Sequence, residues 1–406
     1  MKRPYLLALF LVGIQHVSAQ QVLTFARADS LLQHNLQSQI DGKDVEAAKA
    51  SLRQSRSYEN PEVQLMHNLV NPTNHRWLDT GKTGEDDIQL SQPIAIGGQH
   101  KRIVEQNEAL VKVAEATRQL SFAERRRALH ETMIDIYVLQ QKEEISQRQI
   151  TSAAAILTAY NEQAAKGNIP SMETFRIKTM VCGLEQDLTA LRQQEQNLWK
   201  DVRTQIDVAP QKCRPECSSL DSDLLLLHQR IETSPLPHPA MSCALASEEA
   251  AEKAWRTEKA EALPKLSLQA EYDKNGNIGR NFVAFGVNVT VPLWNRNKGN
   301  IAAARARYNQ ETLKKNLLRN TLLKQWQTDY TNAMTWKETV DKQSKELSEE
   351  LEKGLKATET QMLRHNIGIL AFVDYYNNYK DVRYQLLETQ AELLKAHEAV
   401  RYDLAE

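Results

Sequence analysis

The sequence is short of several features that mark common protein classes. After the N-terminal stretch from Tyr5 to Ile14, no apolar run approaches the roughly 20 residues that a transmembrane helix needs. The net charge is −1, from 51 basic and 52 acidic residues, which argues against a nucleic-acid-binding protein. The chain has no G-x-S-x-G, no H-E-x-x-H and no phosphate-binding loop, so we expect no enzyme activity and no cofactor.

Cysteine is also scarce, with four residues in 406. Cys213 and Cys217 are close enough for a local disulfide, although pairing cannot be deduced from sequence. Both lie in a segment, 207–245, that is rich in proline and is therefore predicted to be an irregular connection. A metal site in this segment is an alternative, but the spacing matches no closed zinc pattern and we expect no metal. The potential ligands are Cys213, Cys217, His228, His238, Met241 and Cys243.

The N-terminus has the pattern of a secretory signal. Lys2 and Arg3 precede the apolar stretch, and Val17-Ser18-Ala19 provides a small-residue cleavage site. We expect a signal peptide at 1–19, with a retained anchor helix as the alternative. No cysteine lies near the cleavage site, so we expect no lipid attachment there. A polar, exported chain of this kind is either soluble outside the cytoplasm or a β-barrel component.

The chain contains two copies of one pattern. Pro61 corresponds to Pro264, Pro93 to Pro292 and Gly98 to Gly299, with offsets of 203, 199 and 201. Further on, Gly167-Asn168-Ile169 corresponds to His365-Asn366-Ile367, with an offset of 198. A nearly constant offset over half the chain indicates a duplicated structural unit. We expect a first repeat at 20–206, a connecting segment at 207–245 and a second repeat at 246–406.

Each repeat has two segments in which apolar and polar residues alternate. We predict strands at about 62–70, 87–93, 265–273 and 282–292. The clearest example places Leu266, Leu268, Ala270 and Tyr272 opposite Lys265, Ser267, Gln269 and Glu271. Period-two alternation gives a sheet with one apolar and one polar face. Such strands suit either a membrane-spanning barrel or soluble hairpins packed on helices.

Long helices follow the strands in both repeats. A first helix is predicted over 24–58, with Thr24 as its N-cap. Helical hairpins follow at 98–205, with a tip near 167, and at 299–404, with a tip near 366. Their first arms contain no proline, and a helix of that length is a rod of about 100 Å. Apolar residues repeat every seven positions, interrupted by Glu143, which indicates a coiled-coil seam: Phe122, Leu129, Ile136, Ile150 and Leu157.

Four strands cannot close a barrel, and an open sheet edge in lipid leaves backbone groups unsatisfied. If the strands lie in a membrane, the chain must therefore oligomerise. Three copies would give twelve strands, enough for a lumen, with cyclic symmetry. The fold predicted is mainly α with a small transmembrane β part: a trimeric 12-stranded barrel continued by an α-helical coiled-coil tunnel.

This arrangement resembles the TolC-like outer-membrane efflux channel family over nearly the whole mature chain. Asn60-Pro61 and Leu263-Pro264 precede the strands, and the strand exits resemble the strand–Pro–Gly–helix junction of the family. The exits contain Pro93, Gly97, Gly98, Pro292 and Gly299. Gly167-Asn168-Ile169 resembles the turn at the periplasmic tip. The second tip has His365 where the family has glycine, which leaves its turn geometry open.

The resemblance implies a passive exit duct in a tripartite pump, located in the outer membrane with its helical part in the periplasm. The implied partners are a periplasmic adaptor (membrane fusion protein) and an inner-membrane transporter of the RND type. The strand entries and exits are most similar to the branch that serves heavy-metal efflux. A type I protein-secretion duct and a periplasmic coiled-coil scaffold without a channel are the alternatives.

The resemblance also implies roles for individual residues. The tips would contact the adaptor through Gly167, Asn168, Ile169, Asn366, Ile367 and Gly368, although plain helix–helix turns would look the same. Glu173 and Asp374 would narrow the duct as acidic rings, or else lie on solvated helix faces. Gly97-Gly98 could bind an anion, but tight backbone curvature at the junction also explains the pair.

Overall fold

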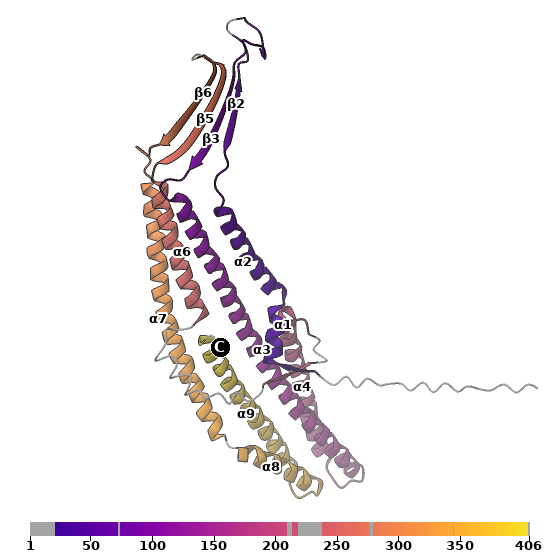
Figure 1. Cartoon of the computed structure of the whole chain (residues 1–406). Coiled ribbons are helices and arrows are strands. Elements are labelled where there is room, and N and C mark those ends of the chain that lie inside the picture. Colours follow the sequence, from indigo (N-terminus) through magenta and orange to yellow (C-terminus); the bar gives the residue numbers. More distant parts are fainter. Residues whose placement is uncertain are drawn as a thin grey trace, which may run out of the picture. The chain divides into compact units, whose positions relative to one another are not determined.

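The computed structural model describes residues 21–71, 74–208, 213–217, 238–276, 279–343 and 345–404 (Figure 1). The expected signal peptide, most of the connecting segment and His228 lie outside these ranges. Among the described residues, no helix combines the length and apolar character needed to cross a membrane. The chain divides into two compact units, one formed by 1–35, 126–224 and 330–399, the other by 36–125, 225–329 and 400–406.

The second unit contains a four-stranded antiparallel sheet in the order β2-β3-β5-β6. Its strands are β2 (Glu62–His67), β3 (Asp86–Ile94), β5 (Lys265–Gly276) and β6 (Gly279–Thr290). The alternating segments of both repeats therefore form strands, and β3 of the first repeat pairs with β5 of the second. The prediction for β2 extended too far, because Asn68 and Leu69 belong to the loop that follows.

Helices of the second unit follow and precede these strands. They are α2 (Leu36–Ser55), α6 (Pro239–Glu261) and the first parts of α3 (Gln99–Ala165) and α7 (Lys298–Lys342). The start of α6 corrects the expected connection at 207–245, because regular structure resumes at Pro239. His238 caps this helix by accepting the amide N–H of Ala240 at 3.0 Å, and proline at the first helical position suits a helix start.

The first unit holds α1 (Phe25–Gln33), α4 (Ser171–Gln205), α8 (Lys345–Leu363), α9 (Ile369–Asp403) up to residue 399, and the remainders of α3 and α7. Its core lies where α3, α4, α8 and α9 meet, around the fully buried residues Ile177, Met362, Phe372 and Tyr376. Leu129 and Ile136 of the predicted seam are also fully buried. Two short strands that were not predicted, β1 (Gln21–Thr24) and β4 (Cys213–Glu216), pair in parallel.

The two helices expected to be continuous are each broken. The predicted helix 24–58 divides into α1 and α2, and Asn35 at the break donates its side-chain amide to the carbonyl of Gln205 at 3.0 Å. Thr24 does cap α1, accepting the N–H of Arg27 at 3.3 Å. The second long arm ends as α7 at Lys342 and resumes as α8 at Lys345. No proline or glycine marks this break; α8 instead packs on α9, with Glu352 and Glu359 accepting tyrosine hydroxyl bonds.

Candidate functional site

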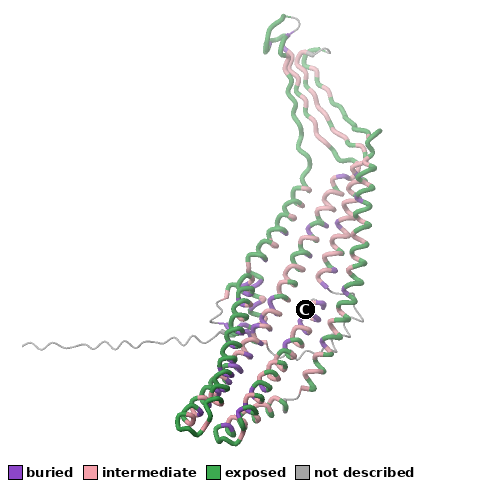
Figure 2. Tube along the Cα trace, turned by 180° about the vertical axis from the view of Figure 1, so that it is seen from behind, coloured by how far each residue is buried: buried purple, intermediate pink, exposed green. Residues whose placement is uncertain are grey.

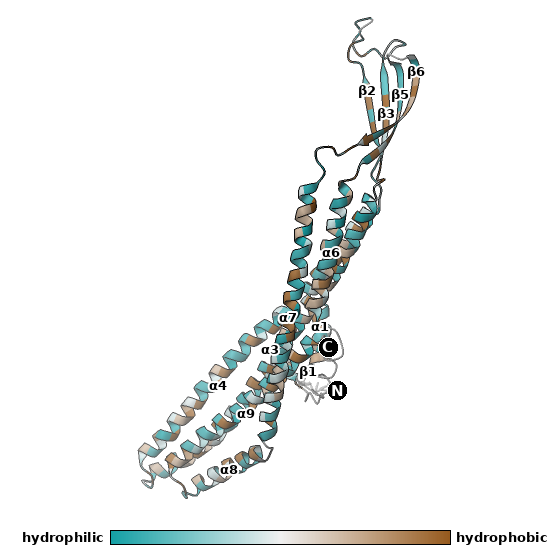
Figure 3. Cartoon of the chain, turned by 90° about the vertical axis from the view of Figure 1, so that its left-hand side faces the viewer, coloured by the Kyte–Doolittle hydropathy of each residue, from teal (hydrophilic) through white to brown (hydrophobic). Residues whose placement is uncertain are grey.

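The register of the sheet separates an apolar face from a mainly polar one. Leu266 faces Val289, Leu268 faces Val287, Ala270 faces Phe285 and Tyr272 faces Val283, so apolar pairs share one side. The same side continues across β3 and β2 through Leu90 with Val63 and Ile88 with Leu65. These apolar side chains are exposed or half-buried in the single chain. The brown and teal segments along the strands show the alternation (Figure 3).

The polar face carries an excess of acidic residues. Its acidic members are Glu62, Asp87, Glu271 and Asp273, and its basic members are Lys265 and Arg280. The difference is 2 − 4 = −2 charges for one chain. Asp87 and Asp273 are direct register partners, an arrangement of like charges that weakens a sheet. Such a face attracts cations.

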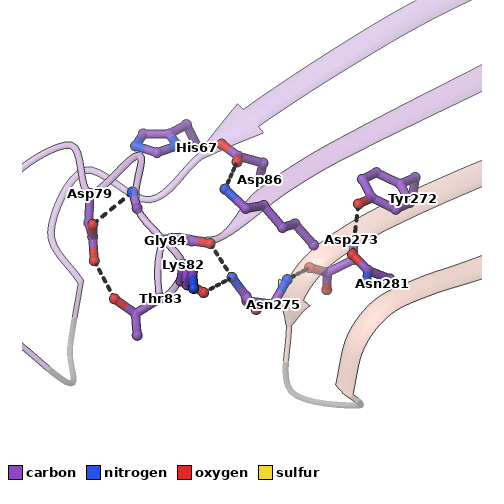
Figure 4. A network of polar contacts seen from close by, with 12 residues as sticks. His67, Asp79, Lys82, Thr83, Gly84, Asp86, Tyr272, Asp273, Asn275 and Asn281 are labelled. Atoms are coloured by element: carbon purple, nitrogen blue, oxygen red, sulfur yellow. Dashed lines mark hydrogen bonds and ion pairs between the residues drawn. The ribbon is translucent and has the colours of Figure 1, made fainter.

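A network of hydrogen bonds lies at the end of the sheet where the loop between β2 and β3 meets β5 (Figure 4). Asp79 in the loop between β2 and β3 accepts hydrogen bonds from Asn74, Thr83 and the N–H of Gly81, and these hold the pKa of its carboxyl well below the usual value. Asn275 donates to the carbonyl oxygens of Gly84 at 2.6 Å and Lys82 at 2.9 Å, which joins the loop to β5. The network fixes the loop of one hairpin on the strand of the next.

His67, the last residue of β2, belongs to the same end of the sheet. Its Nδ1 lies 2.7 Å from Asp86 Oδ1, and the other oxygen of Asp86 accepts Lys274 at 3.0 Å. Among the described residues, no group of three or more His, Cys, Asp and Glu side chains is arranged to hold a metal ion. Asp86 is thus held by a hydrogen-bond contact with His67 and an ion pair with Lys274.

The two strand–helix junctions share a left-handed residue just before the helix, whose carbonyl accepts a hydrogen bond from the N–H four residues later. Gly98 has φ +76°, and its carbonyl accepts the N–H of Arg102 at 3.1 Å as α3 begins. In the second repeat, the equivalent residue is Asn297, with φ +55° and a bond from the N–H of Ile301 at 3.0 Å. Asn tolerates this left-handed conformation better than most residues. The offset of 297 − 98 = 199 equals that of Pro93 and Pro292.

The expected pairing of Gly98 with Gly299 is therefore wrong. Gly299 lies inside α7 without a positive φ, and a Cβ added there meets nothing within 4 Å. Gly97, by contrast, needs to be small, because a Cβ would lie 2.8 Å from Leu263 Cδ1. Close packing and backbone curvature explain Gly97-Gly98 without an anion.

The helical tips of the two repeats have the same turn. At the first tip, the N–H of Asn168 donates to the carbonyl of Gln163, and that of Gly167 to Ala164, both at 3.0 Å. At the second tip, Asn366 donates to Gln361 at 2.9 Å and His365 to Met362 at 3.1 Å. Both are Schellman motifs, which need a left-handed residue after the helix.

His365 supplies that residue at the second tip. Its φ is +59°, against +77° for Gly167, so the histidine keeps the turn despite its side chain. The ring packs on Tyr160, with ring centroids 5.2 Å apart.

The expected tip residues divide into two groups. The ends of the helical hairpins are largely exposed (Figure 2), and Gly167, Asn168, Asn366 and Gly368 are among the exposed residues there. Ile169 and Ile367 instead pack against the core beneath the tips. The turns thus present polar backbone and amide groups outward while their isoleucines anchor them.

Glu173 and Asp374 occupy different environments. Glu173 is half-buried. The pKa of the Tyr160 hydroxyl is raised, first by the burial of Tyr160 itself and second by the negative charge of Glu173. Asp374 is exposed and accepts the side-chain amide of Asn378 at 3.4 Å. By the offset of 198 between the tips, Glu173 corresponds to Ala371 and Asp374 to Arg176. The two acids are therefore not equivalent positions of the duplication.

A groove of about 590 Å³ lies between α4 and α9 near the tips. Its walls include the exposed apolar side chains Met172, Phe175 and Leu370. Lys380 at its edge forms an ion pair with Asp187 at 2.6 Å. The groove offers an apolar surface with a polar border next to both turns.

Sequence reasoning missed a buried ion network in the first unit. His130 of α3 is 2% exposed and places Nδ1 2.7 Å from Glu398 of α9 and Nε2 2.9 Å from Asp29 of α1. Phe25 stacks on the imidazole with centroids 4.3 Å apart. Burial alone would lower the pKa of His130, but the hydrogen bonds to Asp29 and Glu398 outweigh it and raise the pKa. Residues so distant in sequence gave no local signal.

Comparisons with known proteins identify the fold. No protein-family profile matches the chain. The chain is 22% identical over 276 residues to the cobalt-zinc-cadmium resistance protein CzcC of Cupriavidus metallidurans, a match that covers 64% of this chain and 61% of CzcC. It thus spans about three fifths of that relative.

Solved structures match over nearly the whole chain. The Campylobacter jejuni CmeC outer membrane channel superposes with a TM-score of 0.75 at 13% identity, covering 94% of this chain and 85% of CmeC. The Vibrio cholerae outer membrane protein VceC superposes with a TM-score of 0.72 at 14% identity, covering 94% and 95%. The chain has the fold of the TolC-like outer-membrane efflux channels.

Proposed function

We propose that this chain is the outer-membrane channel subunit of a tripartite efflux pump and acts as a passive exit duct rather than an enzyme. The observation that carries the proposal is the two-faced sheet, set on helices in the TolC-like fold. The apolar face would contact lipid and the polar face would line water. Its helical part would lie in the periplasm, below the outer membrane.

The sheet requires other copies of the chain in this setting. Among the described residues, β2 and β6 form its two edges. In lipid, each unpaired backbone group at an edge costs several kcal/mol, so β6 of one chain would pair with β2 of the next. A homotrimer with twelve strands satisfies both edges and leaves a lumen.

The charge of the polar face favours cations as the cargo. Three copies would line the barrel with an excess of six negative charges, from three times −2. Rings of acidic side chains favour cations in channels. Together with the similarity to a cobalt-zinc-cadmium resistance protein, this supports efflux of divalent metal cations.

The tips are the proposed contact for a periplasmic adaptor, which would join the duct to an inner-membrane transporter of the RND type. Asn168 and Asn366 offer exposed amides there, beside the apolar groove between α4 and α9. Asp374 is the better candidate for a constriction, since it is exposed whereas Glu173 is half-buried. If Asp374→Ala leaves single-channel conductance and cation preference unchanged, its role in a constriction is excluded.

Deletion of the gene tests the proposed cargo. We expect increased sensitivity to zinc, cobalt and cadmium, restored by the intact gene, with unchanged sensitivity to detergents and dyes. Sensitivity to drugs alone would contradict the metal assignment, and loss of an exported protein would indicate a type I secretion duct. A soluble monomer in the periplasmic fraction would contradict the channel itself and favour a coiled-coil scaffold.

A further inference from the structure

The turn between β6 and α7 exposes a tryptophan almost completely. Trp294 is 94% exposed, the highest value among the large apolar side chains in the described part of the chain. Its neighbours Val291 and Leu293 are 54% and 57% exposed. Trp is a large side chain that normally buries much of its surface, so this position needs a partner.

The turn is held in place rather than free to fold back. The N–H of Leu293 donates to the carbonyl of Val291 at 2.9 Å, and the N–H of Asn297 to Asn295 Oδ1 at 3.2 Å. The Asn297 side chain donates to both the carbonyl and the carboxylate of Glu258 on α6, at 2.9 and 2.7 Å. Two of these bonds brace the turn internally, and those of the Asn297 side chain fix its C-terminal end on α6.

Basic residues follow the apolar ones in this turn. Arg296 and Lys298 are exposed, and Arg296 donates its Nε–H to the carbonyl of Leu293 at 3.3 Å. Neither forms an ion pair with any residue that the structure describes. The first repeat has the same order at its own strand exit, where exposed Ile94 and Ile96 precede exposed Lys101.

The partner that fits this combination is a phospholipid surface. Val291 continues the alternation of the apolar face of β6 by one more step, and Trp294 lies just beyond it. Tryptophan concentrates at membrane–water interfaces, and lysine or arginine beside it attracts anionic headgroups. Another copy of the chain is a less suitable occupant, since Arg296 and Lys298 would be taken from water without an identified acidic partner.

We infer that the turn 291–298 is an interfacial anchor, with Trp294 among the headgroups of the inner leaflet and Arg296 and Lys298 bound to anionic phospholipid. The inference rests on the proposed function, because it requires the sheet to lie in the membrane. It adds a lipid-recognition site at the periplasmic edge of the duct.

Brominated phospholipids test the position of Trp294. The full chain is reconstituted in vesicles of phosphatidylcholine and phosphatidylglycerol in which the acyl chains carry bromine at carbons 6 and 7. Subtracting the fluorescence of the Trp294→Phe variant from that of the wild type gives the signal of this one tryptophan among the six in the chain. We expect bromine to quench it by more than half, while the signal lost on Trp336→Phe, 42 residues further along the chain, stays unquenched. If Trp294→Phe does not assemble, Trp294→Tyr serves instead.

Retention of anionic lipid tests the basic residues. Phosphatidylglycerol bound to the purified protein is measured by native mass spectrometry for the double variant Arg296→Gln with Lys298→Gln. We expect a loss of about fivefold for each charge removed. The control is Arg319→Gln with Lys324→Gln, two exposed cations further along α7, which should retain the lipid.

The outcomes separate the two proposals. If the protein conducts in the vesicles but Trp294 is not quenched, or the double variant binds phosphatidylglycerol normally, the anchor is wrong and the channel stands. If the wild-type chain neither inserts nor conducts, both proposals fail.

Discussion

The buried contact of His130 with two carboxylates makes a sharp prediction about stability. His130→Gln removes the cation that joins α1, α3 and α9 while keeping a side chain of similar size and hydrogen-bonding capacity. Glu398 is 4% exposed and would lose its ion pair with His130. Removing one member of a buried ion pair costs about 3–5 kcal/mol, because the remaining charge stays desolvated.

The pH dependence follows from the direction of the pKa shift. The pKa of His130 is raised from 6.5, so the folded chain holds this proton more tightly than the unfolded chain. The stabilisation is therefore complete below about pH 6.5 and is lost as the pH rises through the raised value. We expect wild-type protein to lose stability across this interval and His130→Gln to lose less.

Urea unfolding of the detergent-solubilised protein, followed by the circular dichroism of its helices, measures both effects. His34→Gln is the matched control, since His34 is exposed and its Nδ1 lies 2.8 Å from the carbonyl oxygen of Ser30, one turn earlier in the chain. A midpoint for His130→Gln equal to that of His34→Gln, at both pH 6 and pH 8, would refute the reasoning.

Two other predictions concern the junctions and the coiled-coil seam. Gly98→Ala should lower the free energy of unfolding by about 1–2 kcal/mol because Gly98 has φ +76°, whereas Gly299→Ala, inside α7, should raise it by about 0.5–1 kcal/mol. Paired urea titrations check this, and equal effects would contradict the assignment of Asn297 as the counterpart of Gly98. Burial and the nearby Glu195 carboxylate raise the pKa of Glu143 to about 7, so its proton stabilises the folded chain at low pH and this stabilisation is lost as the pH rises from about 4.5 to about 7. Glu143→Gln should flatten the stability curve over that interval, and an unchanged slope would show that Glu143 ionises normally.

Much of the architecture could be predicted from the sequence because its signals are local. Period-two alternation located all four strands of the larger sheet, and the absence of proline indicated the uninterrupted α3. The duplication located both tips, including the one where His365 replaces glycine. The turn there is held by hydrogen bonds between backbone groups, and these form because His365 adopts a left-handed conformation with φ +59°.

The features that sequence reasoning missed depend on contacts between distant segments. β1 and β4 pair across nearly two hundred residues, and the His130 network joins three helices. The break between α7 and α8 has no proline or glycine to mark it. Gly299 was paired with Gly98 through its offset of 201, close to the other offsets of the duplication. In the structure Asn297 holds the left-handed conformation instead and bonds to Glu258.

The central claim is that the polar face of the sheet lines a water-filled, cation-selective duct. The most direct measurement is the reversal potential of the purified protein in a planar bilayer under a potassium chloride gradient, for wild type and for Asp87→Asn with Asp273→Asn. These residues are register partners on the polar face, and the double variant changes the charge of that face from −2 to 0 for each chain. We expect a cation-selective channel whose preference for cations falls in the double variant while its conductance persists. An anion-selective or unselective wild-type channel, or a double variant with unchanged selectivity, would contradict it.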